Sequence, residues 1–274
     1  MNVCLYNNTF TDIGDLKISP NDRAFQYGDG VFETIIFAND NFLFYSDHLQ
    51  RLKAGLQVLS ISMSAEFFNN LEKKLKLLLT KNNATEARIK LIVWRKTGGL
   101  FAPTQNEGNY LALANQYIKA PEVKLNTAFA DSAKLYPHPL SNFKTLSSAS
   151  PYILAGIEKN NKKVDDIILL DHDNHVAEGL TSNIFWIKDS SLFTPSLETG
   201  CIAGIVRHNI LEFCQNEGIK VFEEKFSKKI LLDSDTIFLS NVAGISALKH
   251  IDNKEFKTQN ELLKRIVKFF KDKF

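Results

Sequence analysis

The chain has 274 residues, of which 44% are hydrophobic and 23% are charged, a composition that excludes disordered and fibrous proteins. Its 33 basic and 31 acidic residues leave a formal net charge of +2, which is too balanced for a protein whose main partner is a nucleic acid or an anionic membrane. Composition therefore favours an enzyme with a small-molecule substrate or a neutral binding protein.

The beginning of the chain predicts a small α+β domain over residues 1–117. Alternating apolar residues predict strands. Leucines at helical spacing follow Ser46 and predict a helix, for which Ser46 is a candidate N-cap. The turn Asn39–Asp40 would join the first two strands as a hairpin. The expected strands are 31–38, 41–45, 88–95 and 110–117, and the expected helices are 47–59 and 66–81.

Residues 118–122 are expected to form an interdomain linker, because Pro121 lies between two strand-like runs and no helical pattern spans it. The remaining residues, 123–274, predict a larger domain. Its last helix follows Thr258-Gln-Asn-Glu261, which has the spacing of a capping box. The expected strands are 124–130, 166–170, 176–187, 191–194 and 236–239, and the expected helices are 151–160, 205–217 and 261–273.

The cysteines indicate a reducing compartment. Cys4, Cys201 and Cys214 are far apart and odd in number, so we expect neither a disulfide framework nor a thiolate zinc site. The first residues show no basic segment followed by an apolar one. No later apolar run approaches the length of about 20 residues that a membrane span needs. We therefore expect a cytoplasmic protein with buried, reduced thiols.

The densest group of glycines and charged residues lies in 21–34, where Gly28 and Gly30 precede a strand. Glycines permit close approach of another backbone or a positive φ. A dinucleotide-binding loop is not expected, because a third glycine at the required spacing is missing and the segment leads to a strand instead of a helix. An ordinary hairpin turn is the alternative interpretation.

Lys144 and Glu178 are the candidate reactive groups of the second half. Lys144 follows a proline-rich turn and precedes a helix, so its side chain points either to solvent or between elements. Glu178 lies among apolar strand residues, where a carboxylate needs a cationic or hydrogen-bonding partner. His172, His175 and Glu178 are also compatible with a metal site, but residues 171–174 are typical of an exposed turn, so we expect no metal.

Two short segments are suited to binding an anion. Gly200–Arg207 opens a helix behind two glycines, which leaves backbone N–H groups exposed at the positive end of the helix. Ser240–Gly244 is a small polar loop after a buried strand and would add N–H donors to the same phosphate. Each segment is also compatible with an ordinary turn or helix entry.

Together and in this order, these motifs resemble those of the fold-type IV pyridoxal-phosphate enzymes, the class IV aminotransferase family. The resemblance covers nearly the whole chain. It implies an α+β fold with a small α/β N-terminal domain and a larger C-terminal domain, which contains a mixed, barrel-like sheet with flanking helices, and it implies a homodimer. The motifs that carry it are 22–34, 48–52, 144–146, 178–185, 194–195, 204–207 and 240–241.

The resemblance implies that pyridoxal 5'-phosphate is the cofactor. Lys144 would hold it as a Schiff base and then move the substrate proton, roles that require a primary amine. Glu178 would pair with the pyridine nitrogen and keep it protonated. The residues that would bind the phosphate are Arg51, Ile205, Val206, Ser240 and Asn241, and the candidates for binding substrate carboxylates are Tyr27, Arg88, Arg95 and Lys96.

Within the family, the motifs are most similar to aminodeoxychorismate lyase, which releases 4-aminobenzoate and pyruvate from 4-amino-4-deoxychorismate in folate biosynthesis. D-Amino acid aminotransferases carry an Arg-x-His carboxylate trap in the loop that here follows Arg95, and residues 95–103 lack it. Thr34 and Ala149 stand where branched-chain aminotransferases usually have Gly and Tyr. The alternatives are an aminotransferase for branched-chain or D-amino acids, and a non-catalytic cofactor-binding protein in which Lys144 and Glu178 form only a salt bridge.

Overall fold

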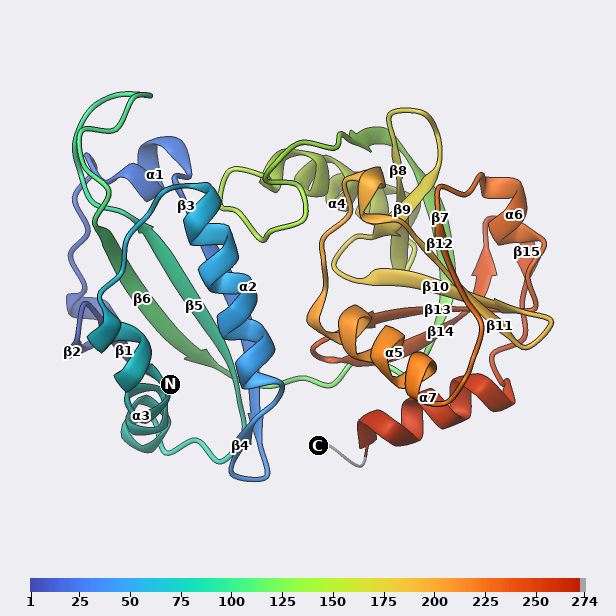
Figure 1. The fold of residues 1–274 in the computed structure, drawn as a ribbon, viewed down its shortest axis with the longest axis horizontal. Helices are drawn as coiled ribbons and strands as arrows, with labels where there is room; N and C mark the ends of the chain where they lie inside the picture. Colours follow the sequence, from blue (N-terminus) through green and yellow to red (C-terminus); the bar gives the residue numbers. More distant parts are fainter. Residues whose placement is uncertain (272–274) are drawn as a thin grey trace. The chain divides into compact units, whose positions relative to one another are not determined.

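The computed structural model describes residues 1–271, which form two compact units (Figure 1). The first unit contains Met1–Ile118 and Phe143–Ser147, and the second contains Lys119–Asn142 and the chain from Ser148 onward. From the sequence, residues 143–147 were expected in the larger domain. They belong instead to the first unit, because Thr145 forms a β-bridge with Val31 and Leu146 N donates to Gly30 O at 2.9 Å.

The first unit is built on a six-stranded antiparallel sheet. Its strands are β1 (Val3–Tyr6), β2 (Thr9–Asp12), β3 (Gly30–Ala38), β4 (Asn41–Phe42), β5 (Ala87–Arg95) and β6 (Gly108–Asn115). They lie in the order β2-β1-β6-β5-β3-β4. The helices are η1 (Ile13–Asp15, a 3-10 turn), α1 (Arg23–Tyr27), α2 (Tyr45–Val58) and α3 (Ala65–Lys81).

Leucine spacing explains how α3 packs on this sheet. Ser64 caps the helix, because its Oγ accepts a hydrogen bond from Phe67 N at 3.1 Å. Leu71, Leu75 and Leu78 recur at helical spacing and are completely buried in the core of the unit. The helix expected over 66–81 is therefore confirmed.

Two local features of the first unit differ from the sequence prediction. The strand expected over 41–45 ends at Phe42, and α2 begins at Tyr45 with Phe44 as its N-cap in place of Ser46. The segment before β3, expected to be a turn, contains the short helix α1. Asp22 caps α1 by accepting a hydrogen bond from Ala24 N at 2.9 Å. With five residues, the helix is too short to give a periodic signal in the sequence.

The second unit is built on a mixed nine-stranded sheet. Its strands are β7 (Val123–Leu135), β8 (Asp166–Asp171), β9 (Val176–Gly179), β10 (Asn183–Lys188), β11 (Ser191–Pro195), β12 (Val221–Glu224), β13 (Thr236–Asn241), β14 (Gly244–Ile251) and β15 (Lys254–Glu255). The order is β12-β11-β10-β13-β14-β7-β8-β9, and β15 pairs with β14. The helices are α4 (Ala149–Lys162), η2 (Leu197–Thr199, a 3-10 turn), α5 (Ile205–Asn216), α6 (Lys228–Leu232) and α7 (Glu261–Lys271).

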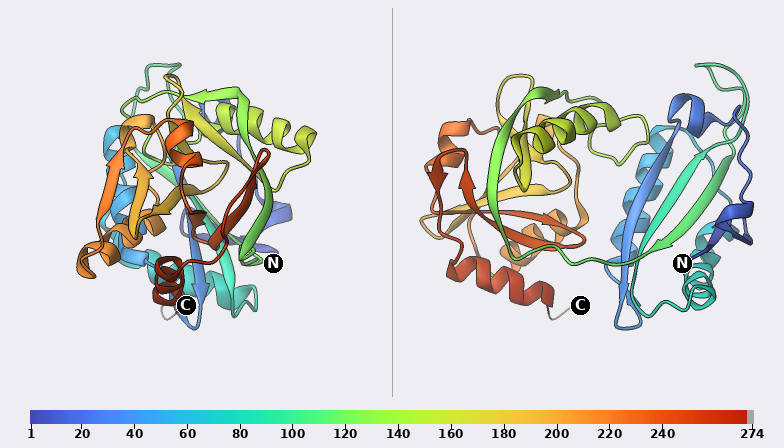
Figure 2. Two further views of the ribbon diagram at one scale, coloured as in Figure 1. Left: turned by 90° about the vertical axis from the view of Figure 1, so that its right-hand side faces the viewer. Right: turned by 180° about the vertical axis from the view of Figure 1, so that it is seen from behind.

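The strands of this sheet curl into a half-barrel, as Figure 2 shows. Parallel pairs join β7 to β8, β7 to β14 and β11 to β12, while the other neighbours are antiparallel. Buried apolar side chains such as Ile184, Trp186 and Leu239 form its core. The α+β fold with a mixed, barrel-like sheet is therefore confirmed.

Turns that interrupt apolar runs account for the differences in the second unit. The strand expected over 176–187 is divided into β9 and β10, because the chain turns and Gly179 N donates to Ser182 O at 2.7 Å. The apolar sequence continues through this turn and gives no signal of it. Residues 240–244, expected to be a loop, form the tight hairpin between β13 and β14, in which Asn241 pairs with Gly244.

Helix α7 does not use the expected capping box. Asn260 Oδ1 accepts hydrogen bonds from Leu262 N at 2.8 Å and from Leu263 N at 3.4 Å. Asn260 is therefore the capping side chain, and the assignment of this role to Thr258 was wrong. The expected end of the helix at Lys273 lies outside the described residues.

The three cysteines are buried, and none of them is paired in a disulfide. Burial raises the pKa of all three thiols, to about 12 for Cys201 and about 11 for Cys214, so they are poor nucleophiles near neutral pH. No helix within residues 1–271 has both the length and the apolar character that a bilayer crossing requires.

We expect Asn260→Ala to lower the free energy of unfolding by about 1 kcal/mol, because the first-turn N–H groups of α7 lose their side-chain acceptor. Thr258→Ala is the matched control and should change it by less than about 0.5 kcal/mol. Urea unfolding followed by circular dichroism measures both values. An equal or larger loss for Thr258→Ala would contradict the capping role of Asn260.

Candidate active site

Lys144 lies on a short extended segment that pairs with the beginning of β3 in the first unit. Its carbonyl oxygen accepts from Phe32 N at 2.8 Å, and the next residue, Thr145, bridges to Val31. The side chain is half-buried, and its Nζ lies 5.2 Å from the centroid of the Phe32 ring. The sheet therefore fixes the backbone of Lys144, and its amine lies over an aromatic ring.

Gly28 brings the chain close to this lysine segment. It ends α1 with a φ of 61°, a conformation that glycine adopts without strain. A Cβ at this position would lie 2.9 Å from Ser147 N and 3.0 Å from Ser147 Cα. The glycine-containing motif is therefore a helix end in close backbone contact with the Lys144 segment, and its interpretation as an ordinary hairpin turn was wrong.

Arg51 on α2 is held by a buried carboxylate from β3. Arg51 Nε donates to Glu33 Oε1 at 2.8 Å, and Arg51 Nη2 donates to Glu33 Oε2 at 2.6 Å, which is the strong bidentate geometry. His48, about one turn earlier, places Nδ1 2.7 Å from Glu33 Oε2. His48 Nε2 is buried and has no hydrogen-bond partner among residues 1–271. Buried polar atoms of this kind are usually satisfied by a ligand or by water.

Glu33 is a residue of this site that was not among the candidates expected from the sequence. It lies between Val31 and Ile35 on the buried face of β3, and a carboxylate on an apolar strand face is the signal that identifies it. Burial alone would raise the pKa of Glu33, but the charge and hydrogen bonds of Arg51, with those of His48, lower it to about 2. Glu33 is therefore ionised and fixes Arg51.

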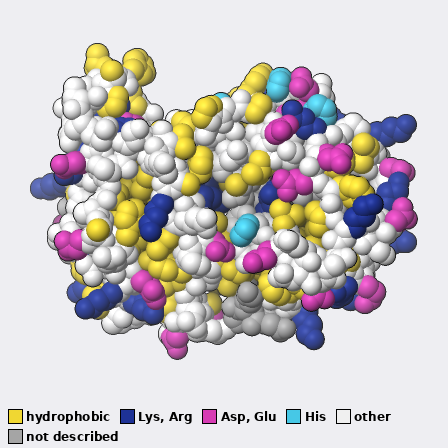
Figure 3. Space-filling model, viewed as in Figure 1, with side chains coloured by type: hydrophobic (Ala, Val, Ile, Leu, Met, Phe, Trp, Pro, Cys, Tyr) yellow, Lys and Arg dark blue, Asp and Glu magenta, His cyan; other side chains and the backbone are white. Residues whose placement is uncertain are grey.

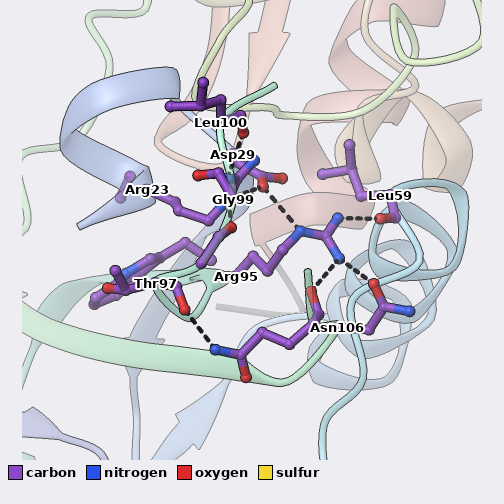
Figure 4. Close-up of polar contacts among 12 residues, drawn as sticks. Arg23, Asp29, Leu59, Arg95, Thr97, Gly99, Leu100 and Asn106 are labelled. Atoms are coloured by element: carbon purple, nitrogen blue, oxygen red, sulfur yellow. Dashed lines mark hydrogen bonds and ion pairs between the residues drawn. The ribbon is translucent and has the colours of Figure 1, made fainter. Parts of the chain in front are cut away.

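Asp29 joins two buried arginines of the first unit (Figure 4). Its Oδ2 accepts from Arg23 Nε at 2.7 Å and from Arg95 Nε at 2.9 Å. Arg95 also donates from Nη2 to Leu59 O at 2.5 Å and from Nη1 to Asn106 Oδ1 at 2.6 Å. Arg95, an expected substrate-binding candidate, therefore connects the residue that precedes β3, the end of α2 and the loop after β5.

The loop 96–107 between β5 and β6 is held through its main chain. Arg23 Nη1 donates to the carbonyl oxygens of Gly98, Gly99 and Leu100, at 2.9, 3.2 and 2.6 Å. Leu100 and Phe101 are 74% and 89% exposed, and Figure 3 shows hydrophobic side chains at the tip of this loop. The loop thus presents an apolar tip from a fixed base.

The structure separates the other candidates for substrate binding. Tyr27 lies at the end of α1, where its ring centroid is 5.5 Å from that of Phe101 and 4.9 Å from the guanidinium carbon of Arg23. Arg88 is exposed near the start of β5, at the opposite end of this strand from Arg95. Seven residues of strand correspond to roughly 23 Å, so Arg88 is not part of the group around Asp29.

Glu178 on β9 is buried in the second unit, with 3% of its surface exposed. Tyr152 Oη donates to Glu178 Oε1 at 2.6 Å, and Ile202 N donates to Oε2 at 3.2 Å. Burial and the adjacent Glu178 carboxylate raise the pKa of Tyr152 far above its usual value, so its hydroxyl remains a donor. The sequence gives no signal for Tyr152, because an aromatic residue on a helix more often belongs to the core.

The N-terminus of α5 has no side-chain cap. Gly204 is the N-cap residue, and a Cβ there would lie 1.9 Å from Asn183 Oδ1, so only glycine fits. Ile205 and Val206 are the first residues of the helix, and their N–H groups have no partner within the helix by position. A helix end of this kind is suited to binding an anion.

Ser240 and Asn241, at the end of β13, lie next to this helix end. Ser240 pairs with Asn183, the residue in contact with Gly204. Ser240 Oγ is buried and lacks a hydrogen-bond partner within the described part of the chain. Asn241 Nδ2 donates to Ser182 Oγ at 3.0 Å. The structure therefore brings the two expected anion-binding segments of the second unit together.

His175, which is close to Glu178 in sequence, belongs to a different group. Ligand atoms of Asp171, Asp173 and His175 lie within 4.8 Å of one another. However, Asp171 Oδ1 accepts from Asp173 N at 3.0 Å and from His175 N at 2.7 Å, which is the hydrogen-bonding pattern of a turn. These residues therefore stabilise the connection between β8 and β9, and Glu178 is not among them.

Comparison with known proteins yields one family and consistent relatives. The model of the family described as amino-transferase class IV matches residues 30–251. The aminodeoxychorismate lyase of Vibrio harveyi is 30% identical over 243 residues, which cover 85% of this chain and 88% of the lyase. The putative branched-chain-amino-acid aminotransferase of Methanocaldococcus jannaschii is 28% identical over 272 residues, which cover 97% of this chain and 94% of that protein.

Solved structures agree on the fold. The crystal structure of the Escherichia coli branched-chain amino acid aminotransferase superposes with a TM-score of 0.91, at 22% identity, over 99% of this chain and 94% of that chain. At this identity the likeness concerns the fold alone.

The ion pair of Glu33 predicts a loss of stability in acid. The carboxyl has an ordinary pKa of 4.5 and a pKa of about 2 in the folded protein, so between these values the unfolded chain binds more protons. The contribution is complete above pH 4.5 and is lost as the pH falls towards 2, and it amounts to about 3 kcal/mol.

Glu33→Gln should abolish this part of the pH dependence. Glu107→Gln, which removes an exposed ion pair with Lys96, should leave most of it. Urea unfolding at pH values from about 2 to 6 measures both. Parallel curves for Glu33→Gln and the wild type would show that Glu33 does not titrate in this way.

Proposed function

Because the chain belongs to the class IV aminotransferase family, we propose that it is a lyase that converts 4-amino-4-deoxychorismate into 4-aminobenzoate and pyruvate, a step of folate biosynthesis. The chain is a pyridoxal-phosphate-dependent enzyme of the lyase or aminotransferase type. Of these two reaction types, the similarity to the Vibrio harveyi lyase supports the lyase.

The residues present fit the cofactor. A phosphate needs several donors. Within residues 1–271, the start of α5 has no side-chain cap, and it lies beside the buried Ser240 Oγ, which has no hydrogen-bond partner there. A pyridinium nitrogen needs an anionic acceptor, which the buried carboxylate of Glu178 provides. When bound, the cofactor supplies an aldehyde that condenses with amines and a conjugated ring that accepts an electron pair.

In this proposal each of the site residues has a defined task. Lys144 Nζ would hold the cofactor and, as a free amine, would take a proton from the substrate ring carbon. Glu178 would hold a proton at the pyridine nitrogen, and the family resemblance assigns the phosphate to Arg51 and to the N–H groups of Ile205 and Val206. The ring would lose a proton and the enolpyruvyl side chain, and the departing side chain would take up one proton to become pyruvate. The ring is then aromatic, and because atoms and electrons balance, no second substrate is needed.

The residues of the loop 96–107 favour the lyase over a D-amino acid aminotransferase. Its preceding arginine, Arg95, is engaged by Asp29 and by carbonyl oxygens. The cation within the loop, Lys96, pairs with Glu107 at 2.6 Å. Residues 96–107 therefore contain no arginine and histidine that could together bind a substrate carboxylate, as the Arg-x-His motif of D-amino acid aminotransferases does.

A branched-chain aminotransferase is the second candidate, favoured by the similarity to the Methanocaldococcus jannaschii protein along 97% of this chain. The two activities differ in one requirement, because an aminotransferase needs a keto acid to collect the amine. The proposal also includes a cytoplasmic homodimer, which the family resemblance supports.

The wild-type protein, loaded with pyridoxal phosphate, should release 4-aminobenzoate from 4-amino-4-deoxychorismate through many turnovers without any keto acid. Lys144→Ala should reduce the rate by a factor of about 1,000 or more, because the primary amine that moves the proton is lost. Fluorescence of the released 4-aminobenzoate measures the rate. Turnover that appears only after a keto acid is added would establish the aminotransferase instead.

Removing Arg51 should selectively weaken binding of the phosphate group. The double variant Arg51→Gln, Glu33→Gln removes both charges, so that neither is left buried alone. Its affinity for pyridoxal phosphate should fall about 100-fold, while its affinity for pyridoxal, which lacks the phosphate, should change less than about threefold. Titration of the apoprotein with each compound measures both, and equal losses would exclude a phosphate-binding role for Arg51.

A further inference from the structure

The carboxylate of Glu178 is held from both of its oxygens within the second unit. Tyr152 Oη donates to Oε1 at 2.6 Å, and Ile202 N donates to Oε2 at 3.2 Å. A carboxylate that accepts a donor at each oxygen can no longer rotate about its terminal bond without breaking one of these bonds. The direction of its remaining lone pairs is therefore set by the two donors.

We propose that Tyr152 is a positioning residue that orients Glu178 towards the pyridine nitrogen of the bound cofactor. The inference rests on the proposed function, because it requires Glu178 to be the partner of that nitrogen. Tyr152 itself need not touch the cofactor. It acts as the outer partners of metal ligands do, by fixing the geometry of the group that makes the contact.

Tyr152 is suited to this task by the way it is packed. It lies in the first turn of α4, and its half-buried ring packs on a core cluster that includes Ala155, Ala177 and Cys201. The raised pKa of Tyr152, caused by burial and by Glu178, keeps its proton in place. The hydroxyl is therefore a donor throughout the pH range in which an enzyme works.

The second donor is equally fixed. Asn183 Nδ2 donates to Ile202 O at 2.7 Å, and Asn142 Nδ2 donates to Cys201 O at 2.8 Å. Ala203 N in turn donates to Asn142 O at 3.0 Å. Hydrogen bonds thus fix the main chain at Ile202 and at both of its neighbours. A change at Tyr152 alone would therefore remove a hydrogen bond from only one oxygen of Glu178.

The test replaces Tyr152 by Phe, which keeps the ring and removes only the hydroxyl. With Glu178 less well oriented, the ring nitrogen of the cofactor carries its positive charge for a smaller fraction of the time. The cofactor bound to Lys144 then loses its proton at higher pH, because less positive charge repels that proton. The midpoint of its absorbance titration should rise by about half a unit, and the affinity of the apoprotein for pyridoxal phosphate should fall about tenfold.

Tyr110→Phe is the matched control for the loss of a buried hydroxyl. Tyr110 is 3% exposed and donates from its Oη to Asn8 Oδ1 at 2.6 Å in the first unit. Both variants should lose a similar amount of thermal stability, and Tyr110→Phe should leave the titration midpoint unchanged. A merely structural role for Tyr152 would give the same unchanged midpoint in both variants, which would overturn the inference.

Glu178→Gln separates this inference from the proposed function. If Glu178→Gln leaves the midpoint and the affinity unchanged, the role of Glu178 itself is wrong. If Glu178→Gln shifts both and Tyr152→Phe shifts neither, only the positioning role falls. In the double variant, Tyr152→Phe should add nothing to the effect of Glu178→Gln, because it acts through that carboxylate. Additive shifts would show that Tyr152 acts independently of Glu178.

Discussion

The backbone pairing between Lys144–Leu146 and the beginning of β3 is the constraint around which the first unit arranges its reactive groups. It places a segment from the middle of the chain on a strand near its start. The close approach requires the glycine at position 28. The residues that follow then face different partners, because Asp29 meets two arginines and Glu33 meets Arg51. Strand β3 and the residue before it, Asp29, therefore set the position of the lysine backbone, of Arg51 and of the loop after β5.

Both units solve the problem of a buried carboxylate, but with different donors. Glu33 is held by the cation of Arg51 and by His48, so its contacts supply compensating charge as well as hydrogen bonds. Glu178 is held by Tyr152 and by a backbone N–H. These two donors are neutral, so they orient the carboxylate without adding a compensating charge. The contacts of Glu33 position another side chain, Arg51, whereas those of Glu178 set the direction of the carboxylate itself.

The sequence could predict the features that depend on pattern or on a motif of several residues. The leucine spacing of α3 located that helix, and the ordered motifs led to the fold, the family and the cofactor. Features decided by competition between neighbouring groups could not be predicted. Thr258 and Asn260 both have capping side chains, and only the path of the chain selects Asn260. The sequence did not identify Glu33 and Tyr152 as site residues, because their roles depend on contacts between elements that are distant in sequence.

The way Arg23 holds the loop 96–107 affects how this protein can change over evolution. Its guanidinium binds main-chain carbonyl oxygens, and every residue type has such an oxygen. The identity of exposed side chains such as Leu100 and Phe101 therefore does not enter the hydrogen bonds that Arg23 makes to the loop. New side chains can appear at the tip while the loop keeps its path, much as recognition loops vary on a constant framework. The loop is thus a place where the chemistry presented to other molecules can diverge without a matching change in the fold.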